Sequence, residues 1–129
     1  MVSPETIMDI LHKEQKGENP VTRVAARKAE VAIENFIDVS GSHTHAYRMR
    51  DLQLEAAAPE ERVRIWECWE ERNNEILQSM AYWKGYINAL MAVLGYTQTN
   101  PDTDVTNTIY VLAEQAEEER RSRREQPIT

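Results

Sequence analysis

A chain of 129 residues has room for one domain, so we expect a single helical domain over residues 1–129. Only 4 Gly and 5 Pro accompany 41% hydrophobic and 29% charged residues, which excludes fibrous and disordered classes and favours an all-α fold. The net charge of -7 argues against a broad nucleic-acid surface, because phosphate binding depends on clustered Lys and Arg. Nucleic acid is therefore an unlikely partner, whereas an acidic inhibitor that imitates nucleic acid stays open.

The first residues, MVSPETIMDILHKEQ, lack the basic region and the apolar run of a signal peptide, so we expect a cytoplasmic protein. Residues 76–94 approach the length of a membrane span, but polar residues interrupt them and we expect no membrane partner. Cys68 is the single cysteine, which excludes an intrachain disulfide. We interpret it as a small packing residue.

Prolines mark the expected helix starts in this chain. Pro at the first helical position loses no hydrogen bond, and Ser or Asn before it can cap the exposed amides. Four dipeptides fit this pattern, three of them with a capping side chain: Ser3-Pro4, Asn19-Pro20, Ala58-Pro59 and Asn100-Pro101. They predict helices from Pro4 to about Gln15, from Pro20 to about Val39 with Ser40-Gly41 as a stop, from Pro59 to Gly95, and from near Pro101 onward.

Two stretches are ambiguous. Residues 42–57 suit a helix by their apolar spacing but alternate in part as a strand does, and we predict a helix because no partner strand exists elsewhere. Residues 103–111 are rich in β-branched residues, so a local strand competes with the last helix there. Residues 113–129 form a charged C-terminal tail, extended or frayed, in which acidic residues offset the Arg120–Arg124 cluster.

The 59–95 helix is the element around which we expect a small helical bundle. A heptad pattern places nine residues on one seam, eight of them apolar. The helix is densely charged up to Glu75, whereas 76–94 carry one charge, Lys84, and are apolar on most sides. Short or alanine-rich helices would not cover such a surface, so we expect a second copy to complete the core as a dimer or higher oligomer.

The expected oligomer interface consists of the heptad seam and one neighbouring residue. Its members are Trp66, Trp69, Asn73, Ile76, Met80, Trp83, Ile87, Leu90, Met91 and Leu94. Asn73 is the only polar residue of the seam, and two interpretations stay open for it. It fixes the register by pairing with its own copy, or it lies at the solvent edge of the charged half.

No motif for catalysis or for a cofactor is present. His43 and His45 form an HxH pair, and His12 is the third histidine, but residues two apart point to different sides of a helix. We therefore expect no metal site, no catalytic residue and no enzymatic activity. The sequence also lacks a glycine-rich phosphate loop and a nucleophile elbow.

Aromatic and basic residues together form a candidate ligand site, since such groups stack on a base and bind a phosphate. The candidate ligand contacts are His45, Tyr47, Arg48, Arg50, Tyr82 and Tyr86. They favour a module that binds or sequesters a nucleotide-like small molecule at subunit junctions. The alternative is that these residues belong to ordinary core and rim.

The leading functional interpretation is a non-catalytic, acidic interaction protein that binds another protein, as an adaptor or an inhibitor. The nucleotide-binding module is the main alternative, and an enzyme whose polar site is assembled from scattered residues is the third. The run LQSMAYWKGYINALM, Leu77–Met91, slightly resembles the closing helix of small phage-encoded proteins that sequester cyclic-nucleotide signals. This resemblance covers one segment and implies a viral origin and the nucleotide-binding alternative.

Overall fold

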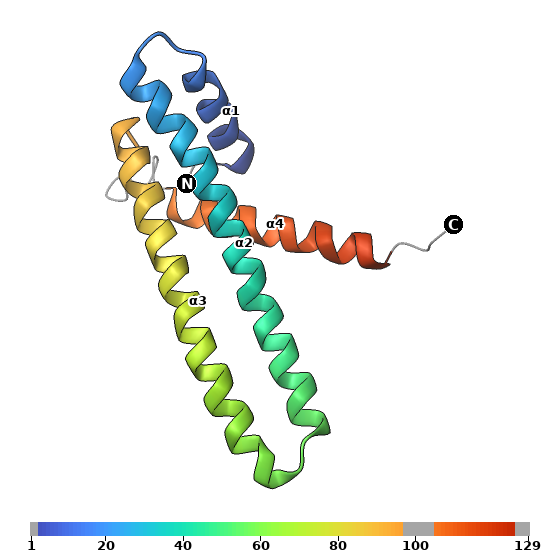
Figure 1. Cartoon of the computed structure of the whole chain (residues 1–129). Helices are drawn as coiled ribbons and strands as arrows, with labels where there is room; N and C mark the ends of the chain where they lie inside the picture. The colour runs from blue at the N-terminus through green and yellow to red at the C-terminus, as the bar shows by residue number, and fades with distance from the viewer. Residues whose placement is uncertain (1–2, 97–104, 126–129) are drawn as a thin grey trace.

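The computed structural model describes residues 3–96 and 105–125, and these residues form four helices and no strand. The all-α prediction is confirmed. The helices are α1 (Pro4–Gln15), α2 (Pro20–Ala56), α3 (Pro59–Val93) and α4 (Thr106–Glu125). In Figure 1, α2 and α3 form a long antiparallel hairpin, α1 lies beside the first part of α2, and α4 crosses the hairpin and projects away from it.

The expected stop at Ser40-Gly41 is wrong, because α2 continues through it for 37 residues. The helical prediction for residues 42–57 is confirmed, as part of this same helix. Gly41 keeps a negative φ, and a glycine inside a helix costs only about 1 kcal/mol relative to alanine. Contacts with α3 along the whole of α2 outweigh that cost.

The helix ends follow the capping signals that the sequence carries. Ser3 accepts a hydrogen bond from the Thr6 amide at 3.2 Å, and Asn19 accepts one from the Val21 amide at 2.9 Å. After α3, Gly95 has a φ of +94°, the left-handed conformation that glycine adopts without strain. The Tyr96 amide then bonds the Met91 carbonyl at 2.9 Å, which closes the helix in a Schellman arrangement.

The main hydrophobic core lies at one end of the hairpin, where α1 and α4 pack against it; we call this the proximal end, and the α2–α3 turn the distal end. Every described helix contributes to this core. Its fully buried large side chains include Ile7, Leu11, Ile33, Phe36, Ile87, Met91 and Ile109. Closely packed alanines of α2, Ala26, Ala29 and Ala32, let the neighbouring helices approach.

Part of the expected oligomer interface lies inside the single chain. Ile87 and Met91 are fully buried, and Asn73 is 6% exposed, so these three side chains are not available to a second copy. These side chains are covered because α2 is long enough to pair with α3 along its length. The sequence had predicted a helix only from Pro20 to about Val39. The expectation of self-association rested on an apolar face of α3 that the rest of the chain would not cover, and burial of these three residues removes that part of the argument.

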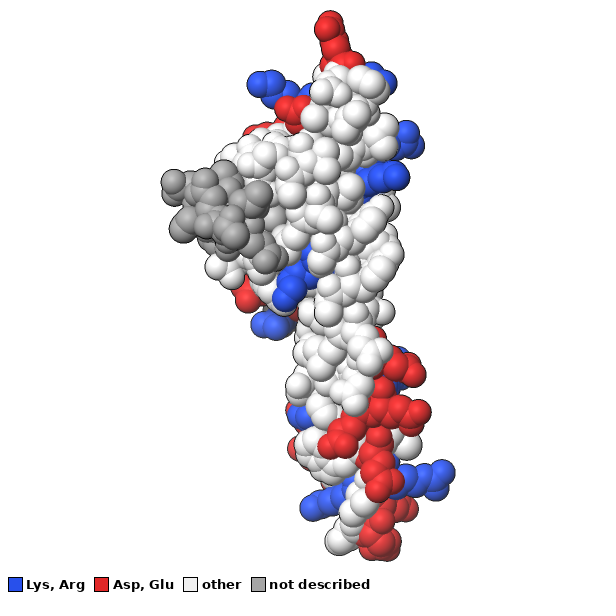
Figure 2. All heavy atoms as spheres, turned by 90° about the vertical axis from the view of Figure 1, so that its left-hand side faces the viewer, with Lys and Arg blue, Asp and Glu red and all other residues white. Residues whose placement is uncertain are grey.

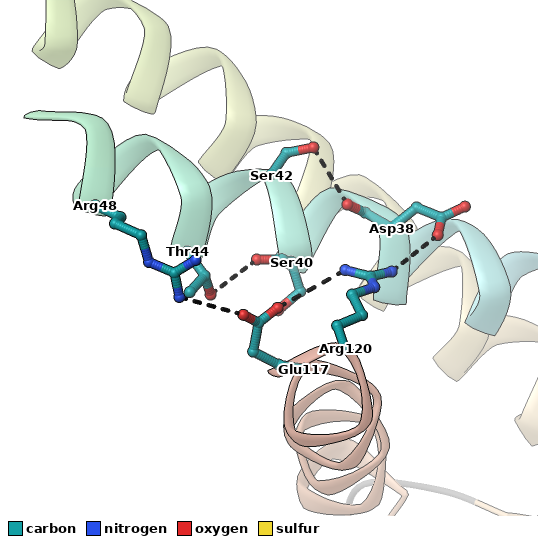
Figure 3. A network of polar contacts seen from close by, with 7 residues as sticks. All are labelled: Asp38, Ser40, Ser42, Thr44, Arg48, Glu117 and Arg120. Atoms are coloured by element: carbon teal, nitrogen blue, oxygen red, sulfur yellow. Dashed lines mark hydrogen bonds and ion pairs between the residues drawn. The ribbon is translucent and has the colours of Figure 1, made fainter. Parts of the chain in front are cut away.

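Helix α4 begins at Thr106, later than the expected start near Pro101; the Asn100-Pro101 cap lies outside the described residues. The stretch from Thr106 to Val111, for which a strand competed, is helical. Where α4 crosses α2, Glu117 lies 3.6 Å from Arg48 and 3.8 Å from Arg120 (Figure 3). The Arg120 guanidinium also lies 3.4 Å from the Asp38 carboxylate.

Gly41 makes room for this crossing. A Cβ atom at residue 41 would lie 2.0 Å from Nη1 of Arg120, so an alanine there would displace the guanidinium. The glycine that we expected to end a helix therefore lies beneath the Arg120 side chain of α4.

Gly41→Ala should change the free energy of unfolding by less than about 1 kcal/mol, because the gain in helix propensity is offset by loss of the exposed Arg120–Asp38 pair. Gly85→Ala is the matched control, since nothing lies within 4 Å of a Cβ there, and it should stabilise by about 0.5–1 kcal/mol. Urea denaturation measures both. An equal gain in the two variants would show that Arg120 does not lie against α2.

Asn73 is buried between the two long helices, so neither interpretation made from the sequence describes its surroundings. Its Oδ1 accepts no hydrogen bond from any described residue. A buried amide oxygen without a donor costs about 1–3 kcal/mol. Asn73 therefore lowers the stability of the hairpin. A polar residue in such a seam is useful only if it disfavours a shifted register of the two helices.

Asn73→Leu should raise the free energy of unfolding by about 1–3 kcal/mol and the melting temperature by a few degrees, because it removes the unpaired amide and adds apolar contact. Asn74→Leu, at the exposed neighbouring position, serves as the control and should change little. Thermal and chemical denaturation of the full chain would measure both. A destabilised Asn73→Leu variant would mean that the amide has a partner.

Charge is unevenly distributed over the molecule. Figure 2 shows many acidic side chains, with Lys and Arg among them, over the distal part of the hairpin, whereas the middle of the proximal part is largely uncharged and has side chains of both signs at its edge. No helix among the described residues is long and apolar enough to cross a membrane.

Candidate protein-binding groove

A groove runs between α2 and α3 at the proximal end, on the flank that α1 and α4 do not line. It consists of two adjoining hollows of about 510 and 400 Å³, which share Val24 and Lys28. We call it the proximal groove, and its apolar lining is Pro20, Val21, Val24, Ala25, Val31, Ala32, Tyr82, Trp83, Tyr86, Leu90 and Val93. Arg27 and Lys28 also line it, with Asn35 at its inner end.

The lining is apolar and yet open to solvent. Five side chains are about half exposed or more: Val21 65%, Val24 49%, Val31 51%, Tyr82 63% and Val93 50%. Single exposed apolar residues are normal on proteins, but a contiguous set of them marks an interaction surface. The proximal groove is such a set, formed by residues from two different helices.

Helical spacing explains how these residues meet. Val24 and Val31 are seven residues apart, so they share one face of α2, and Tyr82, Tyr86 and Val93 share one face of α3 in the same way. The rings of Tyr82 and Tyr86 stack at 6.2 Å with an interplanar angle of 6°, and Trp83 meets Tyr82 edge-on at 5.1 Å. The aromatic wall is therefore held in place by contacts within α3.

The distal half of the hairpin has an aromatic cluster in place of a deep core. The Arg50 guanidinium carbon lies 4.7 Å from the ring centres of Tyr47 and Trp66 and 4.5 Å from that of Trp69. The same guanidinium bonds the Asp51 carboxylate at 2.9 and 3.0 Å. Arg50 thus joins the two helices through cation–π contacts and is already occupied within the chain.

The six candidate ligand contacts are not brought together. Tyr47 and Arg50 belong to the distal cluster, whereas Tyr82 and Tyr86 line the proximal groove about 20 Å away along α3. His45 and Arg48 line a third hollow, where Arg48 is paired with Glu117, and His45 also lines a neighbouring hollow together with Arg50. A single nucleotide site built from all six is therefore not formed by this chain alone.

The histidines also lie apart. His12 of α1 bonds Glu30 of α2 at 3.2 Å, and hydrogen bonds from Gln15 and then His12 hold the pKa of Glu30 below its ordinary value although burial opposes them. His43 packs edge-on against Tyr47 at 4.8 Å, and burial lowers its pKa. Among the described residues, no group of three or more His, Cys, Asp or Glu is placed to hold a metal ion.

Sequence reasoning placed Trp83 and Leu90 in an interface and Tyr82 and Tyr86 at a ligand site, but it missed the α2 wall. Val24 and Val31 lie outside the alanine-rich stripe of α2, and apolar residues outside that stripe could have indicated a second apolar face on this helix. Cys68, interpreted as a packing residue, is exposed on the surface of α3.

Comparisons of the chain with models of known protein families, with curated proteins and with solved structures found no match.

Arg50→Met should lower the free energy of unfolding by about 1–2 kcal/mol and shift tryptophan emission, because three rings lose their cation. The free energy of unfolding of Arg50→Lys should lie between those of Arg50→Met and the parent, since a lysine keeps the charge but not the planar stacking. Arg64→Met, an exposed change on the distal part of α3, is the control. If Arg50→Met melts like the parent, the cluster does not hold the distal hairpin together.

Proposed function

We propose that this chain is a non-catalytic protein-binding module and that a partner protein binds in the proximal groove. The observation that carries the proposal is the contiguous exposure of Val21, Val24, Val31, Tyr82 and Val93, which no described helix covers. Covering them removes apolar surface from water, at about 25 cal/mol for each Å².

The composition of the groove supports a protein partner. Tyrosine and tryptophan are enriched among the residues that dominate protein interfaces, because they supply large contact areas with few rotatable bonds. The proximal groove contains Tyr82, Trp83 and Tyr86 in one wall, and their ring contacts limit the conformations that must be frozen on binding. Such a wall is suited to act as a pre-formed anchor site.

The experiment selects helical peptides from an unbiased display library on the full-length chain and measures their affinity for variants. Val31→Ser combined with Tyr82→Ser should weaken the selected peptides by at least about tenfold, since interface anchors contribute 2 kcal/mol or more. Both residues are largely exposed in the free chain, so the fold should persist.

Leu77→Ser is the matched control, because Leu77 is an exposed apolar residue of α3 outside the groove. It should leave the affinities unchanged. Peptides that bind the Val31→Ser, Tyr82→Ser variant as tightly as the parent would contradict the proposal, and so would an equal loss in Leu77→Ser.

A further inference from the structure

We propose that the occupant of the proximal groove is an amphipathic helix of a partner protein, about four turns long, with acidic residues on the flank that faces α2. This inference rests on the proposed protein-binding function and adds the shape and the charge of the partner.

The shape follows from the walls. The lining residues extend along α2 from Pro20 to Asn35, a distance of about 22 Å at 1.5 Å per residue. Both walls are helices, whose backbone amides and carbonyls are bonded within the helix. The groove therefore offers no open sheet edge to an extended strand, and an occupant must satisfy its own backbone, as a helix does.

The side chains of the groove match the stripe of such a helix. Anchors at i, i+3, i+4 and i+7 lie along one face and would follow the line from Val24 to Val31 on one side and from Val93 to Tyr82 on the other. Two helices that lie side by side leave a groove into which the ridge of a third helix packs. The bound helix would complete a three-helix arrangement at the proximal end.

The charge of the partner follows from Arg27 and Lys28. Among the described residues, no Asp or Glu lines the groove, although the whole chain has 22 acidic and 15 basic residues. Neither Arg27 nor Lys28 forms an ion pair with any other described residue. The nearby carboxylate of Glu30 is turned toward α1, where it bonds His12 and Gln15. Both cations are thus free to meet carboxylates of a bound helix.

A second copy of the chain fits this description less well. Acidic residues lie on the distal half of α3, at Glu67, Glu71 and Glu75, and the apolar seam of that half is only partly buried, since Trp66 is 41% exposed. The same half also carries Arg62, Arg64 and Arg72, so a second copy would bring cations as well as carboxylates to Arg27 and Lys28.

The test uses two labelled peptides of about 15 residues, each four turns long, with the same leucine stripe and with either Glu or Lys on the flanks. Fluorescence anisotropy with the full-length chain should show the Glu peptide binding at least about tenfold more tightly than the Lys peptide. The preference should shrink as salt is raised, because the contacts at the rim are screened. Arg27→Glu combined with Lys28→Glu should reverse the preference for the Glu peptide. The distal control, Arg62→Glu combined with Arg64→Glu, should keep that preference.

If both peptides bind with equal affinity and the Val31→Ser, Tyr82→Ser variant binds neither, the inference of an acidic flank is wrong and the proposed function stands. Binding of neither peptide, or binding indifferent to those two substitutions, would overturn both. Sedimentation velocity completes the test. A dimer that the Glu peptide dissociates would show that a second copy occupies the groove, which also contradicts the inference.

Discussion

The two-residue connection Ala57-Ala58 between two helices of 37 and 35 residues is the constraint on which the rest of the structure depends. So short a link requires α2 and α3 to run antiparallel as neighbours, and their seams then face each other within one chain. The hairpin is longer than α1 and α4 can cover, since α1 packs at its proximal end and α4 crosses it near its middle. A deep core therefore forms at one end, and the Arg50 cluster holds the other end with cation–π contacts.

The same constraint explains why the proximal groove stays open. Helix α2 has three neighbours at its proximal end, with α1 and α4 on one flank and α3 beside it, and the opposite flank has no described neighbour. Ala26, Ala29 and Ala32 face the packed side, whereas Val24 and Val31 face solvent. Val24 and Val31 leave apolar surface on the open side, which is consistent with a surface that is covered by another molecule. Arg27 and Lys28 line the groove, and Figure 2 shows many acidic side chains, with Lys and Arg among them, at the distal end.

Much of the fold was predictable because local signals decide helix starts. The Ser3 and Asn19 caps and the prolines after them placed the beginnings of α1 and α2, and Pro59 placed that of α3. Gly95 was recognised as a stop and Gly41 was mistaken for one, and the difference is tertiary: Gly95 takes a positive φ, whereas Gly41 lies under Arg120 of α4, far away in the sequence. The heptad seam of α3 is buried within the chain at Asn73 and Ile87, whereas Trp66 is 41% exposed, and a periodic pattern does not say which helix covers it. Only the α3 wall of the groove was predicted from the sequence, because the two walls come from segments that are distant in the sequence and meet only when α2 pairs with α3.

The most direct test of the central claim, that the proximal groove is the docking surface, is hydroxyl-radical footprinting of the full chain, free and with a bound acidic helix. In the free chain, Tyr82, Val24 and Val31 should react as exposed side chains and Met91 should be protected. Binding should protect the first three and leave Trp66 and Leu77 reactive, since these lie outside the groove. Protection of Tyr82 already in the free chain, or protection on binding that falls on Trp66 and Leu77, would contradict the account.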